Sequence, residues 1–412
     1  MGRKVFLSFL GTSSYSNIQY YFDSEREHHF ETPFIQEAIL KYLIDIKGFK
    51  ITPKVFLTGL AKVNWEKKQG LKEGLNKIDS TFESSAVEIP DGKSKEELLM
   101  IFLKVYEHLN DGDEVYFDIT HGFRSLPMLT MVFLNYAKFL KSISVKAIYY
   151  GAFDAKQAID NQNWAPVWNL TYFSTIQDWT NAANQFLQTG NGLFLSDLIE
   201  AEGLENLKES ISNFTKEILV NRGVSIYHGK TQAAVIEQIE SIGFKNKDPL
   251  NIILKKVQSH FKSYNPDSIS NGLNAVKWCI DNGLIQQGAT LLEEFATTYV
   301  LHKIGKIQFI TDKVFRGIVS SALSVPKKTY IAKFSNIAED DEISLSLKNE
   351  EEEIISKIYS LDDYKKISET VRKIKKSIRD DINHAGFRDQ PRTYDEFKES
   401  LQKRYKEFLK MI

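Results

Sequence analysis

The chain has 412 residues, of which 42% are hydrophobic and 26% charged, a composition typical of a soluble globular protein with two domains. The net charge of −1 excludes a protein that coats nucleic acid with a basic surface, so any such contact must be local. No apolar run approaches the ~20 residues that span a bilayer, and the N-terminal VFLSFLG is too short for a signal peptide. We therefore expect a cytoplasmic protein without membrane contact. The single cysteine, Cys279, excludes a disulfide framework, and its apolar neighbours predict a buried side chain.

The first part of the chain alternates short apolar runs with longer amphipathic stretches. This alternation predicts a parallel sheet covered on both faces, an α/β Rossmann-like domain at residues 1–168. One helix is predicted at 32–47, with Thr32 as its N-cap, Pro33 in its first turn and Gly48 as its stop. Another is predicted at 94–109. The predicted strands are 4–10, 54–58, 86–89, 114–119 and 145–151.

After Trp168 the hydrophobic period becomes that of helices. Residues 171–305 are predicted to be almost entirely helical, with a clear helix at 284–304, and further helices are expected at 362–383 and from 394. The acidic stretch AEDDEISLSLKNEEEE, 338–353, is interpreted as a solvated surface loop. The predicted organisation is thus an α/β domain (1–168), a helical connector (169–265) and an all-α domain (266–412).

Two neighbouring predicted strands end in polar loops. The first strand runs into FLGTSSYS, and the fourth runs into DITHGFRSLP, where Pro127 opens an amphipathic helix. Ligands of open parallel sheets bind beyond the carboxyl ends of the strands, where a helix N-terminus and an arginine favour an anion. Either loop alone could be an ordinary polar turn, but the two together favour a ligand site. The candidate ligand-binding residues are Gly11, Thr12, Ser13, Ser14, Thr120, His121, Gly122, Phe123, Arg124 and Ser125.

These loops lack the patterns of common nucleotide-binding proteins. Neither GxGxxG nor GKS/GKT occurs in the first loop, which argues against a nucleotide-dependent oxidoreductase and a P-loop NTPase. The adjacent His28 and His29 have no second cluster of ligands, so we interpret them as an exposed loop and expect no metal site.

The predicted helix 362–383 ends in IRDDINHAGFR, in which Arg379 and His384 form an R-x4-H pair next to Asp380 and Asn383. A histidine can exchange protons with the 2′- and 5′-oxygens of RNA, and an arginine can stabilise the charge on the phosphorane. The spacing alone is weak evidence for a ribonuclease, because NRGVSIYH contains a similar Arg–His pair. An arginine and a histidine at a helix end could also simply make ordinary surface hydrogen bonds. Residues 361–412 carry 14 basic and 10 acidic side chains, a net +4 that suits an RNA backbone.

DITHGFRSLP, together with WCIDNGLIQQGATLLEE and RDDINH, resembles the DxTHG family of type III CRISPR ancillary proteins. Those proteins join a CARF domain (CRISPR-associated Rossmann fold) to a HEPN ribonuclease domain with an R-x4-6-H motif. The resemblance implies a CARF domain at 1–168, a HEPN domain at 266–412 and a homodimer or higher assembly. It also implies that a cyclic oligoadenylate, commonly cyclic tetra-adenylate, is the allosteric activator and single-stranded RNA the substrate.

Carried over to this sequence, the resemblance assigns Gly11–Ser13, Thr120–Gly122, Arg124 and Ser125 to the ligand and Arg379 and His384 to catalysis without a metal. Asn383, directly before His384, is a further catalytic candidate. Two alternatives stay open. One is a CARF protein that also degrades its activator with help from His121 or the hydroxyl residues. The other is a ligand-gated RNA-binding regulator without activity, against which the presence of both Arg379 and His384 speaks.

Overall fold

The computed structural model describes residues 2–122, 126–242, 248–325, 342–387 and 389–412. The chain divides into two compact units, Met1–Gln177 and Asp178–Ile412, with the division inside helix α6 (Thr171–Thr189). None of the helices in the described part is long and apolar enough to cross a membrane.

A sheet of nine strands organises the first unit, and all five predicted strands are confirmed as one continuous part of it that ends at the edge strand β5. They run parallel in the order β5-β4-β1-β6-β7, which is the doubly wound order of a Rossmann-like sheet. Their bounds are β1 (Lys4–Phe9), β4 (Thr52–Leu57), β5 (Ala86–Glu88), β6 (Glu114–Asp118) and β7 (Ser144–Gly151).

Four further strands were not predicted. They extend the sheet beyond β7: β9 (Gln162–Asn169) pairs antiparallel with β7, β2 (Ile18–Tyr21) follows, and β3 (His29–Thr32) and β8 (Gln157–Ile159) pair antiparallel with β2 and β9. Three of them have only three or four residues. The fourth, β9, contains Pro166, and a proline in a sequence argues against a strand.

The predicted helix 32–47 is wrong at its start. Thr32 is the last residue of β3, and α1 (Ile35–Lys41) begins three residues later, followed by a π-helical turn to Ile46. The Thr32 hydroxyl accepts from the Phe34 backbone N–H at 3.1 Å. Thr32 therefore satisfies a backbone donor just before the helix, although it is the last residue of a strand and not the N-cap. Gly48 has a φ of +68°, as expected of a residue that ends a helix.

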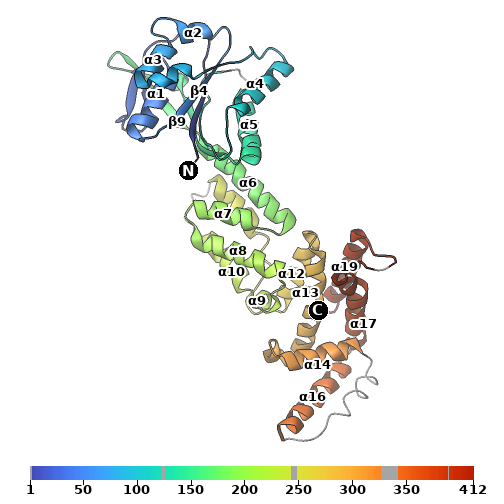
Figure 1. Ribbon diagram of the computed structural model, residues 1–412. Coiled ribbons are helices and arrows are strands. Elements are labelled where there is room, and N and C mark those ends of the chain that lie inside the picture. The colour runs from blue at the N-terminus through green and yellow to red at the C-terminus, as the bar shows by residue number, and fades with distance from the viewer. Residues whose placement is uncertain (1, 123–125, 243–247, 326–341, 388) are drawn as a thin grey trace. The chain divides into compact units, whose positions relative to one another are not determined.

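Helices cover both faces of the sheet (Figure 1). On one face α1, α2 (Lys62–Glu66) and α3 (Leu71–Ile78) bury Ile35, Trp65 and Leu71. On the other face lie α4 (Lys95–Glu107) and α5 (Leu126–Lys141), with Ile101, Val105 and Phe133 in the second core. The predicted helix 94–109 is α4, and Ser94, the first residue of that range, is its N-cap and accepts from the Glu97 N–H at 3.1 Å.

The second unit is helical, which confirms the prediction for 171–305. The predicted helix 284–304 is α13 (Ile285–Lys303), and its apolar residues Leu291, Leu292, Phe295 and Tyr299 are buried. The other helices up to residue 324 are α7 (Leu193–Ala201), α8 (Glu205–Leu219), α9 (Gly223–His228), α10 (Lys230–Ser241), α11 (Pro249–Gln258), α12 (Ser270–Asp281) and α14 (Lys313–Ser324).

The acidic stretch 338–353 is not a loop from residue 342 onward, and residues 338–341 lie outside the described part. Residues 342–353 form the first turns of α16 (Glu342–Ser360). Glutamate is a good helix former, and acidic side chains near a helix N-terminus interact favourably with its dipole. Ile354 and Ile358 anchor the following turns because both are fully buried.

The predicted helix 362–383 is one continuous helical run, but its middle part is π-helical and not α-helical. It comprises α17 (Tyr364–Ile374), a π-helical segment Lys375–Arg379 and α18 (Asp380–Asn383). The terminal helix α19 (Tyr394–Leu409) begins at the predicted residue, with a capping box between Thr393 and Glu396.

Candidate functional site

The two polar loops of the first unit meet where the strand order reverses. Among the five parallel strands, β4 lies on one side of β1 and β6 on the other, so the loops after β1 and β6 follow the ends of neighbouring strands at this reversal. They touch at Gly11: a Cβ atom there would lie 2.8 Å from the Tyr15 hydroxyl and 3.3 Å from His121 Nδ1. A larger side chain at position 11 would therefore displace the Tyr15 hydroxyl and crowd His121.

Asp118, the last residue of β6, holds the second loop in place. It is fully buried, and its carboxylate accepts from the Ser8 hydroxyl at 2.7 Å and from the Thr120 N–H and hydroxyl at 2.9 and 2.5 Å. Thr120 Oγ1 in turn accepts from the Gly151 N–H at 2.7 Å. Burial raises the pKa of Asp118 against the opposing effect of His121 and these hydrogen bonds. Because the Thr120 hydroxyl is occupied within the loop, this residue shapes the site rather than offering its hydroxyl to a ligand.

His121 turns inward, toward the first loop. Its ring meets the Tyr15 ring edge-on with centroids 5.2 Å apart, and the Tyr15 hydroxyl accepts from the Gly11 N–H at 3.0 Å. Burial lowers the pKa of His121, although the nearby Asp118 opposes this. Burial thus disfavours the charged form of this ring, and the described residues leave the buried Nε2 atom without a hydrogen-bond partner.

A cavity of about 240 Å³ lies beside the two loops. Gly11 and Thr12 from the first loop and Gly122 from the second line it, and residues after β4 and β5 complete it, among them Thr58 and Lys93. The Lys93 ammonium lies 2.6 Å from Asp91, which also lines the cavity. The cavity thus combines backbone groups, the hydroxyls of Thr12 and Thr58 and a lysine paired with an aspartate, beside apolar side chains such as Phe9 and Leu60. This mixture of polar and apolar groups suits a ligand that combines phosphates with bases.

Ser13 and Ser14 are exposed and are not among the residues that line this cavity. Phe123, Arg124 and Ser125, the remaining candidates of the second loop, lie outside the described residues, and α5 begins directly after them at Leu126.

Three residues that support the first loop or line the cavity, Asn64, Thr58 and Lys93, were not predicted to do so from the sequence. Asn64 of α2 donates to the Gly11 and Ser13 carbonyls at 3.1 and 3.0 Å and so braces the first loop. Lys93 and Thr58 follow strands β5 and β4; Lys93 comes shortly after the predicted strand 86–89, whereas Thr58 was predicted as the last residue of the strand 54–58. Nothing local in the sequence marks Asn64, because its role depends on a partner more than fifty residues away.

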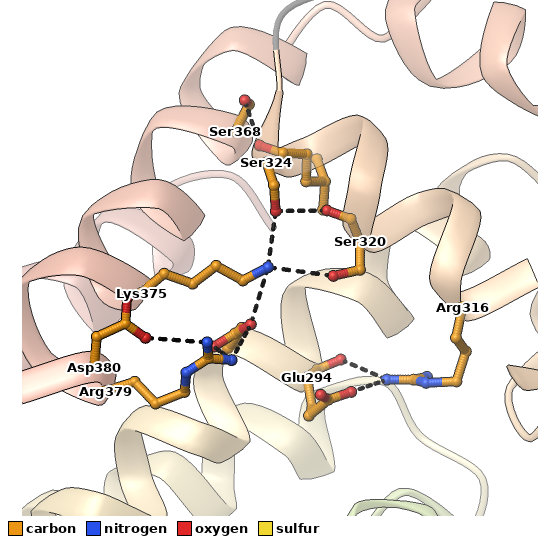
Figure 2. Close-up of polar contacts among 10 residues, drawn as sticks. Glu294, Arg316, Ser320, Ser324, Ser368, Lys375, Arg379 and Asp380 are labelled. Carbon is orange, nitrogen blue, oxygen red and sulfur yellow. Dashed lines mark hydrogen bonds and ion pairs between the residues drawn. The ribbon is translucent and has the colours of Figure 1, made fainter. Parts of the chain in front are cut away.

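In the second unit, Arg379 ends the π-helical segment Lys375–Arg379 and is bound by two carboxylates (Figure 2). Its Nη1 donates to both carboxylate oxygens of Glu293 at 2.9 Å, and Nη2 donates to Asp380 Oδ1 at 3.1 Å. Lys375 Nζ lies 3.3 Å from the same Glu293. Burial raises the pKa of Glu293, although Lys375 and Arg379 act in the opposite direction.

His384 is exposed and follows the last residue of α18, five positions after Arg379 on the same helical run. Its backbone N–H donates to the Asp380 carbonyl at 3.1 Å, which fixes the helix end. The neighbouring Asn383 accepts from the Gln286 side chain of α13 at 3.4 Å. No hydrogen bond joins Arg379 to His384 within the described residues, so the structure places them near one helix end without direct contact.

The other Arg–His pair of the sequence, Arg222 and His228 in NRGVSIYH, has a different environment. Arg222 precedes α9, and His228 at the end of that helix places Nδ1 2.5 Å from Asp267. Cys279 is buried as predicted, and burial raises the pKa of its thiol to about 12. His29 begins strand β3 and His28 lies 2.9 Å from Asp23, and the described residues contain no group of three side chains suited to a metal ion.

Comparisons with known proteins agree with the architecture of the first unit. Residues 5–154 match the family model of the CRISPR system endoribonuclease Csx1, CARF domain, and residues 175–269 match that of the CRISPR-associated protein MJ1674, second domain. The chain is 34% identical over 125 residues to CRISPR-associated protein MJ1674 of Methanocaldococcus jannaschii. This similarity covers 29% of the chain and 19% of that relative. The comparisons therefore support a CRISPR-associated protein with an N-terminal CARF domain and a helical C-terminal region.

Proposed function

We propose that this chain is an endoribonuclease of type III CRISPR defence that a cyclic oligoadenylate activates. The observation that supports the proposal most is the meeting of the two polar loops at the switch point of a domain similar to the Csx1 CARF domain. The adjacent cavity offers Gly11, Thr12, Gly122 and Lys93 to a ligand that combines phosphates and bases. Cyclic tetra-adenylate is the activator we expect, and Arg124 and Ser125 would add contacts from the second loop.

The second unit would be a HEPN domain that cleaves single-stranded RNA without a metal. The exposed His384 would take the proton of a 2′-hydroxyl or protonate the leaving 5′-oxygen, and Arg379 would stabilise the charge on the phosphorane. Asn383, beside His384, would contact the RNA at the same place. Attack by the 2′-hydroxyl leaves a 2′,3′-cyclic phosphate and a 5′-hydroxyl.

The proposed function includes a homodimer, and an apolar face on the first unit supports it. Along α5, Met128, Val132, Tyr136 and Phe139 recur at helical spacing and are exposed, Phe139 by 85%. Phe133 of the same helix is buried against the sheet. Exposed Leu99, Met100 and Leu103 of α4 lie on the same side of the sheet. A two-fold axis through this face would pair identical surfaces and bring two copies of the ligand loops to one cyclic ligand.

The proposal is tested by incubating the protein with labelled single-stranded RNA, EDTA and each cyclic oligoadenylate in turn. We expect cleavage that depends on one ring size, persists in EDTA and leaves 5′-hydroxyl ends. Loss of all cleavage in EDTA, or products with 5′-phosphates, would refute the chemistry. Activator-dependent RNA binding without cleavage would instead indicate a regulator.

Variants assign the catalytic residues. Arg379→Ala and His384→Ala should each lower cleavage by about 100-fold or more, because each removes a group that acts in the transition state, while cyclic oligoadenylate binding stays intact. Arg222→Ala is the matched control and should cleave nearly as the wild type does. If Arg222→Ala and His228→Ala were the inactive variants, the assignment to 379 and 384 would be wrong.

A second candidate activity is degradation of the activator in the first unit. The unsatisfied Nε2 of His121, at the junction of the two loops, favours it because a neutral imidazole can act as a general base. The test follows cyclic tetra-adenylate over time with the wild type and His121→Ala, with ligand binding measured in parallel. Linear products that disappear in the variant would establish this activity, and intact ligand in both samples would exclude it.

A further inference from the structure

We propose that Glu293 is a positioning residue that orients Arg379 for RNA cleavage. This inference rests on the proposed function and assigns a role to a side chain outside the R-x4-H motif. Glu293 lies on α13, 86 positions before Arg379, and its residue is only 6% exposed. Its carboxylate meets the helical run that carries the motif at the π-helical segment Lys375–Arg379.

Glu293 binds two cationic side chains at once. Both of its oxygens accept from Nη1 of Arg379 at 2.9 Å, and Lys375 Nζ lies 3.3 Å from one of them. Lys375 also donates to the Ser324 hydroxyl at 2.8 Å (Figure 2). A buried carboxylate must be compensated by charge and hydrogen bonds, so this group strongly favours one arrangement of the two cations.

Lys375 and Arg379 lie four positions apart, a spacing that places two side chains on the same face of a helix. Both contact the one carboxylate of Glu293. The segment between them is π-helical, a winding that often occurs at functional sites.

The same contacts leave part of the guanidinium for a substrate. Glu293 occupies Nη1, Asp380 accepts from Nη2, and Nε is buried without a hydrogen-bond partner among the described residues. The side chain as a whole is 33% exposed. With Nη1 held by Glu293 and Nε buried, we infer that Nη2 is the group that a phosphate oxygen would contact, and Asp380 would have to share or release it.

The adjacent Glu294 provides a matched control on the same helix. Its side chain is 55% exposed and pairs with Arg316 of α14, which also donates to the Thr298 hydroxyl at 3.0 Å. Figure 2 shows this pair separate from the contacts of Arg379. A Glu294→Gln substitution therefore removes the same charge from the neighbouring position without touching Arg379.

The experiment measures kcat and KM for RNA cleavage at saturating activator for the wild type, Glu293→Gln, Glu293→Asp and Glu294→Gln. A guanidinium displaced by about 1 Å can cost roughly 100-fold in rate, so Glu293→Gln should lower kcat by about 10- to 100-fold with little change in KM. Glu293→Asp, which keeps the charge, should recover part of the rate even if the Gln variant folds poorly. Glu294→Gln should stay within about threefold of the wild type.

A double variant separates positioning from general stability. Adding Glu293→Gln to Arg379→Lys should slow cleavage much less than Glu293→Gln does in the wild type, because the oriented guanidinium is already absent. Equal effects in both backgrounds, or a Glu293→Gln variant as active as Glu294→Gln, would overturn the inference while leaving the proposed function intact. A wild-type protein that cleaves no RNA with any cyclic oligoadenylate would overturn the proposed function and this inference with it.

Discussion

At the scale of single residues, burial sets the protonation of His121. Its pKa lies below the ordinary value of 6.5, so the unfolded chain binds the proton more strongly than the folded one. The stability associated with a neutral His121 is therefore present above pH 6.5 and lost as the pH falls toward the folded-state pKa. We predict that wild type loses unfolding free energy relative to His121→Gln below pH 6.5, by up to about 1.4 kcal/mol for each pH unit.

Denaturant unfolding at a series of pH values between 7.5 and 5 measures this difference, and NMR titration of the histidine ring measures the pKa itself. A constant difference between the two proteins over that range would contradict the prediction. It would mean that the ring protonates in place, with Asp118 rather than burial controlling it.

At the scale of elements, the acidic residues of α16 form a helix because its following turns are buried. Ile354 comes directly after the run of glutamates and is fully buried, whereas Glu352 is exposed. We predict that Ile354→Ala lowers the unfolding free energy by about 2–5 kcal/mol, the usual cost of an emptied core position. Glu352→Ala should change it by less than about 0.5 kcal/mol. Denaturant unfolding monitored by circular dichroism measures both values, and equal small effects would show that this segment does not pack as a helix.

At the scale of the whole molecule, the exposed face of α4 and α5 should hold two copies together. Val132 is 55% exposed and lies in the middle of this face. We predict that Val132→Asp yields a monomer that cleaves RNA weakly even with saturating activator, because a charge on each copy would be buried against the other. Light scattering after size-exclusion chromatography measures the mass. Val63→Asp, an exposed valine of α2 under the other face of the sheet, is the control and should remain a dimer. A dimeric, fully active Val132→Asp would place the interface elsewhere.

The sequence by itself determined the central sheet and the position of the candidate site. Short apolar runs such as Val115–Phe117 that alternate with amphipathic stretches indicate strands buried on both faces, and polar loops after such strands are expected at one edge of a parallel sheet. Helix periodicity similarly predicted α13 and the helical run that carries Arg379 and His384, because these signals are local.

Only the tertiary structure decided how those residues are used, because their partners are distant in the chain. The Thr120 hydroxyl is turned inward by Asp118 and Gly151, and Arg379 is anchored by Glu293 across 86 positions. The short strand β2 exists because β3 and β9 pair with it, although neither follows from a local pattern. Spacing and periodicity in the sequence indicate which face of a helix or strand a residue lies on. Hydrogen bonds between distant segments depend on how those segments pack together, and a local sequence pattern does not contain that information.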